Sequence, residues 1–293
     1  MLYLLVVSLV WAFSFGLIKN ALAGVDANFI AAARLWVAFL VFAPFLRLRG
    51  LDRRLALRLG LVGVFQFGLM YLAYNYSFGS LKAYEVALFT IFTPIYVTLI
   101  DDALRRRLNG LHLAMAALAV AGTAVVKQGG LANPEALGGF LLVQVSNLCF
   151  AFGQVYYVHT LKNAPGVSNL RVFGLLYLGG ALVASLSAAI FTPWAQFSLS
   201  LPQAGTLLYL GAVASGVSFF LWNKGARQVN AGALAIFNDL KVPLAVLVSL
   251  LFFGEQASLP HLLLGGALVL AALLVNEWGP GWLPIRSLGT DKP

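Results

Sequence analysis

The sequence predicts an all-α integral membrane protein with ten transmembrane helices arranged as two inverted five-helix repeats. Three observations lead to this fold class. Of the 293 residues, 61% are hydrophobic and only 10% are charged, whereas soluble domains carry roughly 25% charged residues. Short polar turns divide the chain into apolar runs of about 20 residues, the length that spans a bilayer. The two halves also share a weak internal repeat.

The apolar runs define ten expected spans, each bounded by turn residues or charges. In order, they cover 2–21, 27–46, 57–77, 84–100, 110–127, 136–158, 170–191, 203–222, 231–251 and 260–276. The first run lacks the basic n-region and small-residue cleavage site of a secretory signal, so we expect it to be retained as a span. No run is left for a soluble domain.

The lysines and arginines support this division, because cytoplasmic loops are enriched in them. Of the 19, 14 fall on one predicted side, 3 fall on the other, and Arg34 and Lys241 lie inside spans. This asymmetry places both termini in the cytoplasm and favours an even number of spans. It also explains the net charge of +9 without a nucleic-acid partner.

The internal repeat relates spans one and six, and spans four and nine. Residues 8–22 align with 147–161 at an offset of 139, and Pro94 matches Pro243 at an offset of 149. Because five spans are an odd number, the second copy must cross the membrane inverted, as in many secondary transporters. We therefore expect repeats at 1–127 and 136–276, followed by a polar cytoplasmic tail at 277–293.

The chain resembles the EamA-like branch of the drug/metabolite transporter superfamily. The resemblance lies in "SLVWAFSFGLIKNAL" of the first span, "AAARLWVAFL" of the second, and "PLAVLVSLLFFGE" followed by "LLLGGALVLAALLV" near the end. It implies a central cavity lined mainly by spans 1, 3, 4, 6, 8 and 9. One departure is "LIDDALRRRLN", where the family often ends the fourth helix with Gly-Glu, a pattern kept here only at Gly254 and Glu255.

The ninth span carries Asn238, Asp239 and Lys241 just before Pro243. Its apolar residues contribute about 5 kcal/mol towards insertion, and Asp and Lys near the centre cost about 2.5 to 3.5 each. A span this marginal is expected to turn its polar face to protein or water. Asn238 and Lys241 share a face, and Pro243 frees the carbonyl of Asp239. These features predict a site for a small polar solute.

The repeat predicts that this cavity is asymmetric. Shifted by 149, Asn238 and Lys241 correspond to Phe89 and Phe92, so a polar wall would face an aromatic one. We expect Lys241 to bind a carboxylate and Phe92 and Tyr96 to contact an apolar part of the solute. Glu85 lies on the same helix, either at the rim or as a proton-coupling acid, and Asp239 is the other coupling candidate.

Further candidates lie on neighbouring spans, each with a structural alternative. Arg34 is expected to be structural, snorkelling from near a helix end or pairing with Asp239. Five polar or aromatic residues are expected to line the cavity, although the aromatic ones also suit interfacial belts. They are Trp11, Tyr74, Asn75, Gln154 and Trp222.

The sequence offers little for other chemistry. Its three histidines fall at separate helix ends, and no GxSxG, HExxH or P-loop motif occurs, so we expect no enzyme activity, metal or cofactor. Small residues at Ala116, Ala117, Gly122, Gly265 and Gly266 permit close helix packing, either within the chain or in a homodimer.

We therefore expect a secondary transporter in the bacterial inner membrane. Its substrate would be a small amino-acid-like or carboxylate-bearing metabolite, exported by alternating access. Bacterial origin and export are implied by the resemblance alone. Two rivals remain at this point: an organic-cation or drug exporter driven by proton antiport, and an integral-membrane enzyme.

Overall fold

The computed structural model describes residues 2–104, 134–164, 166–226 and 231–255, together with three single positions. At 231–236, 238 and 239 only the backbone is described. All regular structure in these ranges is helical. The predicted fifth span lies outside them, as do nearly all of the tenth span, the C-terminal tail and the small residues considered for a dimer interface.

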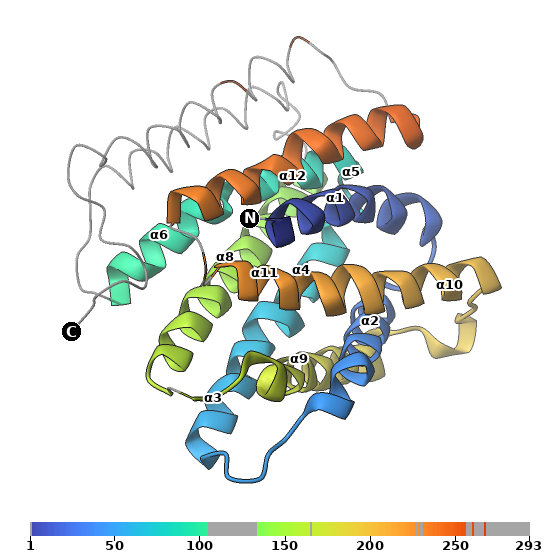
Figure 1. Ribbon diagram of the computed structural model, residues 1–293. Helices are drawn as coiled ribbons and strands as arrows, with labels where there is room; N and C mark the ends of the chain where they lie inside the picture. Colours follow the sequence, from blue (N-terminus) through green and yellow to red (C-terminus); the bar gives the residue numbers. More distant parts are fainter. Residues whose placement is uncertain are drawn as a thin grey trace.

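The first half consists of α-helices interrupted by short turns of other helix types (Figure 1). Its elements are α1 (Leu2–Gly16), η1 (Leu17–Ala21), α2 (Ala27–Phe42), η2 (Ala43–Phe45), α3 (Arg53–Gly63), η3 (Val64–Leu69), α4 (Met70–Ser77), α5 (Ala83–Phe89), η4 (Thr90–Phe92) and α6 (Thr93–Leu104). The segments η1 and η3 are π-helical, whereas η2 and η4 are 3-10 turns.

The second half repeats this style. Its elements are α8 (Pro134–Lys162), α9 (Asn169–Phe191), η6 (Trp194–Gln196), α10 (Leu201–Tyr209), η7 (Leu210–Val217), α11 (Ser218–Ala226) and α12 (Ala231–Phe252). The segment η7 is π-helical and joins α10 to α11 in one continuous span. It therefore interrupts the eighth predicted span much as η3 interrupts the third.

Seven helical stretches in the described ranges are long and apolar enough to cross a membrane, and they match predicted spans one to four and six to eight. The ninth predicted span corresponds to α12, whose helix continues through Pro243. The fourth predicted span, which consists of α5, η4 and α6, is instead interrupted by η4. The interruption comes immediately before α6, which carries Pro94 at its second position. The chain is thus a multi-pass helical membrane protein, and the total of ten spans stays a prediction.

Side-chain caps fix where several helices begin. Asp26 accepts hydrogen bonds from the backbone N–H groups of Asn28 and Phe29 at the start of α2, at 3.1 and 3.0 Å. Asp52 caps α3 in the same way, and Ser200 forms a capping box with Gln203 on α10. These contacts satisfy N–H groups that the first helical turn leaves without partners.

The main contacts between a helix of the first half and a helix of the second half have counterparts in which the two halves have swapped roles. The first helix, α1, packs along α12, and α8 correspondingly packs along α6 (Figure 1). Likewise α2 packs on η7 while α9 packs on η3, and α2 and α9 pack on each other. The predicted repeat requires this pairing, because span one corresponds to six, two to seven, three to eight and four to nine.

The loops sort to two sides of the bundle. On one side, the Arg171 guanidinium donates hydrogen bonds to the carbonyls of Arg47 and Arg49. We call this the arginine-rich side, and it also carries Arg53, Arg54, Arg58, Lys162 and Lys224. On the opposite side Thr192 donates to Asp26 at 2.6 Å, and Gln203 donates to the carbonyl of Ala23.

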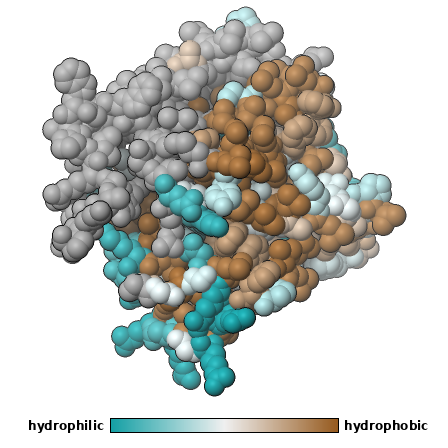
Figure 2. All heavy atoms as spheres, viewed as in Figure 1, coloured by the Kyte–Doolittle hydropathy of each residue, from teal (hydrophilic) through white to brown (hydrophobic). Residues whose placement is uncertain are grey.

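The outer surface is apolar where lipid would contact it. Leucine and isoleucine side chains of α1, α9 and α12 are widely exposed, including Leu9, Leu186, Ile190 and Leu251. Figure 2 shows this hydrophobic surface, with hydrophilic residues gathered at the lower edge, where the loop between α2 and α3 lies in Figure 1. Such a band suits a chain whose helices are surrounded by hydrocarbon.

Candidate functional site

A cavity of about 80 Å³ lies between the two halves of the bundle. This is room for several water molecules, at about 10–15 Å³ each on the same measure. The lining side chains come from spans one, two, three, four, six, eight and nine. They are Trp11, Ser14, Phe15, Arg34, Met70, Tyr71, Tyr74, Thr90, Thr93, Ser146, Asn147, Phe150, Phe219 and Lys241.

Arg34 supplies one of two cations to the cavity. Its side chain is only 3% exposed, so it does not snorkel to the surface as expected. Its Nε lies 3.3 Å from Ser215 Oγ, its Nη2 lies 3.2 Å from Tyr71 Oη, and its guanidinium carbon lies 4.5 Å from the Tyr71 ring centroid. Its buried Nη1 has no hydrogen-bond partner in the described part of the chain. One guanidinium edge therefore remains for a solute.

Lys241 supplies the second cation, from the middle of α12. It is 6% exposed, and its Nζ lies 5.4 Å from the Trp11 ring centroid, within the range of a cation–π contact. Lys241 and Arg34 line the same cavity, so both charges carried by its described lining residues are positive. None of the cavity-lining residues that the structure describes is acidic, so the arrangement suits an anionic group.

Two described acids, Glu255 and Glu85, accept hydrogen bonds from backbone N–H groups at the start of α5. Glu255, at the end of α12, accepts hydrogen bonds from the backbone N–H groups of Ala83 and Tyr84 at 2.8 and 3.0 Å. Glu85 accepts from the backbone N–H of Lys82 at 2.9 Å, at the start of α5. A carboxylate at a helix N-terminus is stabilised by the exposed N–H groups and the helix dipole. Proton coupling through Glu85 stays a prediction.

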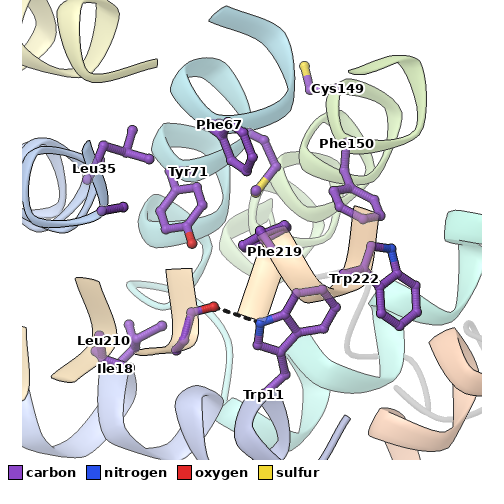
Figure 3. Close-up of a cluster of buried hydrophobic side chains, with 14 of the residues drawn as sticks. Trp11, Ile18, Leu35, Phe67, Tyr71, Cys149, Phe150, Leu210, Phe219 and Trp222 are labelled. Atoms are coloured by element: carbon purple, nitrogen blue, oxygen red, sulfur yellow. Dashed lines mark hydrogen bonds between the residues drawn. The ribbon is translucent and has the colours of Figure 1, made fainter. Parts of the chain in front are cut away.

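An aromatic wall lies on the arginine-rich side of the cavity. Trp11 donates its indole N–H to the carbonyl of Ala214 at 2.9 Å, which fixes the ring (Figure 3). Its centroid lies 4.7 Å from that of Phe219 and 5.1 Å from that of Trp222. Phe150 extends this wall, 5.9 Å from Phe219. These rings offer an apolar surface to a solute and separate the cavity from the arginine-rich side.

A polar wall lies where the fourth predicted span, at η4 and α6, packs against α8. Asn147 donates to the carbonyl of Phe89 at 2.8 Å, and its side-chain oxygen accepts from Thr93 at 3.3 Å. The hydroxyls of Thr90 and Thr93 donate to the carbonyls three residues earlier, where η4 interrupts the helix. Hydroxyl and amide oxygens that accept further bonds thus face the cavity, which suits a neutral hydrogen-bonding group.

Three of the residues proposed from sequence meet in this cavity, namely Trp11, Tyr74 and Lys241. Phe92, which is buried, and Tyr96, which is partly buried, do not line it. Phe92 packs on Phe140 with centroids 6.1 Å apart, and Tyr96 donates to Gln144 at 3.3 Å.

The remaining candidates fall into two groups. Asn75, Gln154 and Trp222 do not line the cavity. Asn75 donates to the carbonyl of Ala27 at 3.4 Å, and Trp222 donates to Gln154 at 3.3 Å. Asn238 and Asp239 lie on α12, but their side chains fall outside the described residues.

Sequence reasoning did not propose the polar wall or Arg34 as cavity residues. Arg34 carried a signal, because a charged residue at the eighth position of a 16-residue helix is too far from either end to snorkel easily. Thr90 and Thr93 carried a weaker one, since they stand directly before Pro94. Ser146 and Asn147 gave no sign of the direction in which they face.

Helices of bilayer-spanning length around a cavity between the two halves are typical of multi-pass membrane transporters. A sequence model described as the EamA-like transporter family matches residues 1–128 and 137–277, most of the chain. The chain therefore belongs to the EamA-like transporter family. The two matched ranges nearly coincide with the two predicted halves, while their inverted relation stays a prediction.

Curated relatives cover nearly the whole chain. It is 42% identical to a "Probable biotin transporter" of Pseudomonas aeruginosa over 95% of this chain and 98% of that one. It is 37% identical to a "Biotin transporter" of Salmonella typhimurium over 99% and 96%. A "Probable amino-acid metabolite efflux pump" of Escherichia coli is 24% identical over 98% and 97%.

A solved crystal structure shares the fold at 20% identity. Its TM-score is 0.66, and the match covers 94% of this chain and 95% of the other.

Proposed function

We propose that this chain is a secondary transporter of biotin that works by alternating access in the inner membrane of a bacterium. The observation that carries this proposal is a central cavity with two cations, an aromatic wall and a neutral polar wall. Biotin has three matching parts: a carboxylate, an apolar thioether ring with its alkyl chain, and a neutral ureido ring. Relatives at 37–42% identity carry the name biotin transporter.

In this proposal the carboxylate binds between Arg34 and Lys241. Buried hydrogen bonds to charged groups are worth roughly 1.5–3 kcal/mol each, and the guanidinium edge of Arg34 without a described partner is preorganised for a carboxylate. The apolar part packs on Trp11 and Phe219. The ureido ring faces Thr93 and Asn147, whose oxygens accept its N–H groups.

This proposal revises the substrate expected from sequence. A carboxylate-bearing metabolite is retained, whereas an amino-acid-like one matches only the name of a relative at 24% identity. A cavity whose described charges are positive disfavours the organic-cation alternative, and a transporter family disfavours an enzyme. The proposal includes cytoplasmic termini, because the arginine-rich side is expected to face inwards.

The test is counterflow of radiolabelled biotin into proteoliposomes that contain the purified protein. Wild type is expected to exchange biotin. Lys241→Ala is expected to lower the apparent affinity roughly 10- to 100-fold, as the loss of one buried charged contact predicts, and Lys241→Arg is expected to retain more of it. Lys162→Ala, which removes an exposed lysine, is the matched control.

Two results would contradict the proposal at different points. Wild-type vesicles that exchange an amino acid but no biotin would refute the substrate. Biotin exchange that is unchanged in both Lys241 variants would remove Lys241 from the site. Preloading biotin inside or outside the vesicles also tests the direction, since export stays a prediction.

A further inference from the structure

Three buried amide side chains lie one helical turn beyond the cavity, on its arginine-rich side. The cavity is lined there by Met70, Phe150 and Phe219. The amides lie four residues before Met70 and four residues after Phe150 and Phe219. Four residues are about one helical turn, so each amide lies on a similar face to its cavity residue. The three amides are Gln66, Gln154 and Asn223. In each span this step leads towards the arginine-rich side, where α3 begins and where α8 and α11 end.

Two of these amides, Gln66 and Gln154, lie at the contact of η3 with α8, and Asn223 lies next to a residue that bonds Gln154. A Cβ added at Gly153 would overlap the Gln66 side chain, so the backbone of α8 touches Gln66 directly. The next residue of α8 is Gln154, whose Oε1 accepts the indole N–H of Trp222 at 3.3 Å. Trp222 precedes Asn223 on α11. Gln66 and Gln154 therefore lie where η3 packs on α8, and Asn223 follows the residue of α11 that contacts Gln154.

Two of the amides make no hydrogen bond within the described ranges. Gln66 is 0% exposed and Asn223 is 1% exposed. Neither the nitrogen nor the oxygen of either amide makes a hydrogen bond within the described part of the chain. Burying four such atoms unpaired is unfavourable, and native structures rarely keep them without a reason. A solute that forms hydrogen bonds with these amides would remove this cost.

An aromatic layer separates the amides from the cavity in this structure. Phe150 and Phe219 line the cavity, and Trp222 closes the layer beside Trp11, with centroids 5.1 Å apart (Figure 3). A solute that passes from the cavity to the arginine-rich side must part these rings. The first polar groups that it then meets are the three amides.

We propose that Gln66, Gln154 and Asn223 form a second substrate site on the transport path, occupied when the arginine-rich side opens. The ligand class is a neutral group with adjacent hydrogen-bond donors and an acceptor, as in a cyclic urea or amide. Side-chain amides offer both donors and acceptors but no charge, so they match a ureido ring and not a carboxylate. This inference rests on the proposed transport of biotin.

The first test separates transport from binding with apolar replacements of similar size, Gln66→Met and Asn223→Leu. In the double variant biotin exchange is expected to fall about 10-fold or more, the loss that two or more hydrogen bonds predict. Equilibrium binding of biotin to the central cavity in detergent is expected to stay within about 3-fold, because the amides do not line it. Ser249→Ala, which removes a buried hydroxyl without a described partner on α12, is expected to leave exchange unchanged.

Unchanged exchange in the double variant would overturn the inference. So would a parallel loss of binding and exchange, because it would show that the amides only maintain the cavity.

The second test does not depend on biotin. In a Cys149→Ala background, Asn223→Cys and Gln66→Cys are treated with a membrane-impermeant maleimide from the arginine-rich side. Labelling of both is expected, since the amides become hydrated when that side opens, while Ser249→Cys stays unlabelled.

Labelled cysteines in a protein that carries no biotin would refute the substrate and leave the path in place. Biotin exchange without any labelling at Gln66→Cys and Asn223→Cys would refute the path alone.

Discussion

Arg34 illustrates how a cation is kept in the middle of an apolar bundle. A charged residue at the centre of a span costs several kcal/mol, and hydrogen bonds to Ser215 and Tyr71 together with stacking on the Tyr71 ring offset part of this cost. Tyr71 also donates to Ser215 at 2.7 Å, so the three side chains hold one another in place. These contacts fix the orientation of the remaining guanidinium edge of Arg34.

Replacing Arg34 by lysine keeps the charge and removes the planar fork. We expect Arg34→Lys to weaken biotin binding about 10-fold, because a point charge cannot hold both Tyr71 and a carboxylate in the same geometry. Isothermal titration in detergent measures this. The control is Arg54→Lys, at an exposed position, and equal affinities of both variants and wild type would exclude Arg34 from binding.

The residues of the cavity were predictable only in part. Lys241 and Trp11 stood out because a lysine and an indole inside apolar runs need an environment that lipid does not offer. Thr93 and Asn147 did not, since one uncharged polar residue is tolerated on almost any helix face. Which face meets the cavity depends on how helices cross, and that is decided by contacts between spans far apart in the sequence.

At the scale of elements, glycines let the third predicted span (α3, η3 and α4) and α9 approach until their backbones touch. A Cβ at Gly63 would overlap the carbonyl of Leu176, and one at Gly179 would overlap that of Gly60. Close approach at small residues is a common basis of helix packing in membranes. It also positions η3, which carries Gln66 and Phe67 beside the site.

Gly63→Ala is therefore expected to destabilise the bundle by roughly 1–3 kcal/mol, the usual cost of overpacking a tight contact. The melting temperature in detergent should fall accordingly. Gly138→Ala has open space around the new methyl group and should be neutral or slightly stabilising, because alanine favours helix. A melting temperature of Gly63→Ala equal to that of wild type would show that the two helices do not meet as closely as described.

The spans themselves followed from hydropathy, and their ends from charges and turn residues. Seven predicted spans match helices of sufficient length and apolarity within a few residues. The π-helical segments η3 and η7 had no such signal, because residues 64–69 and 210–217 look like ordinary apolar helix. Nor did the sequence reveal that the fourth predicted span is interrupted by η4 just before Pro94, whereas α12 continues through Pro243.

For the whole molecule, the two halves meet around the cavity. Glu255 of the second half caps α5 of the first half on one side, and the layer of Phe150, Phe219 and Trp222 lies on the arginine-rich side. Contacts that exchange when the halves exchange are what rocking about a central site requires. The two inverted repeats stay a prediction from the sequence, whereas the residues that join the two halves could be named only from coordinates.

The most direct measurement of the central claim, that two buried cations hold the carboxylate of the solute, is competition against labelled biotin in proteoliposomes. Desthiobiotin, which keeps the carboxylate and the ureido ring, is expected to compete about as well as biotin. Biotin methyl ester, which has lost the charge, is expected to compete at least roughly 10-fold less well. Equal competition by the ester would contradict a site built around Arg34 and Lys241.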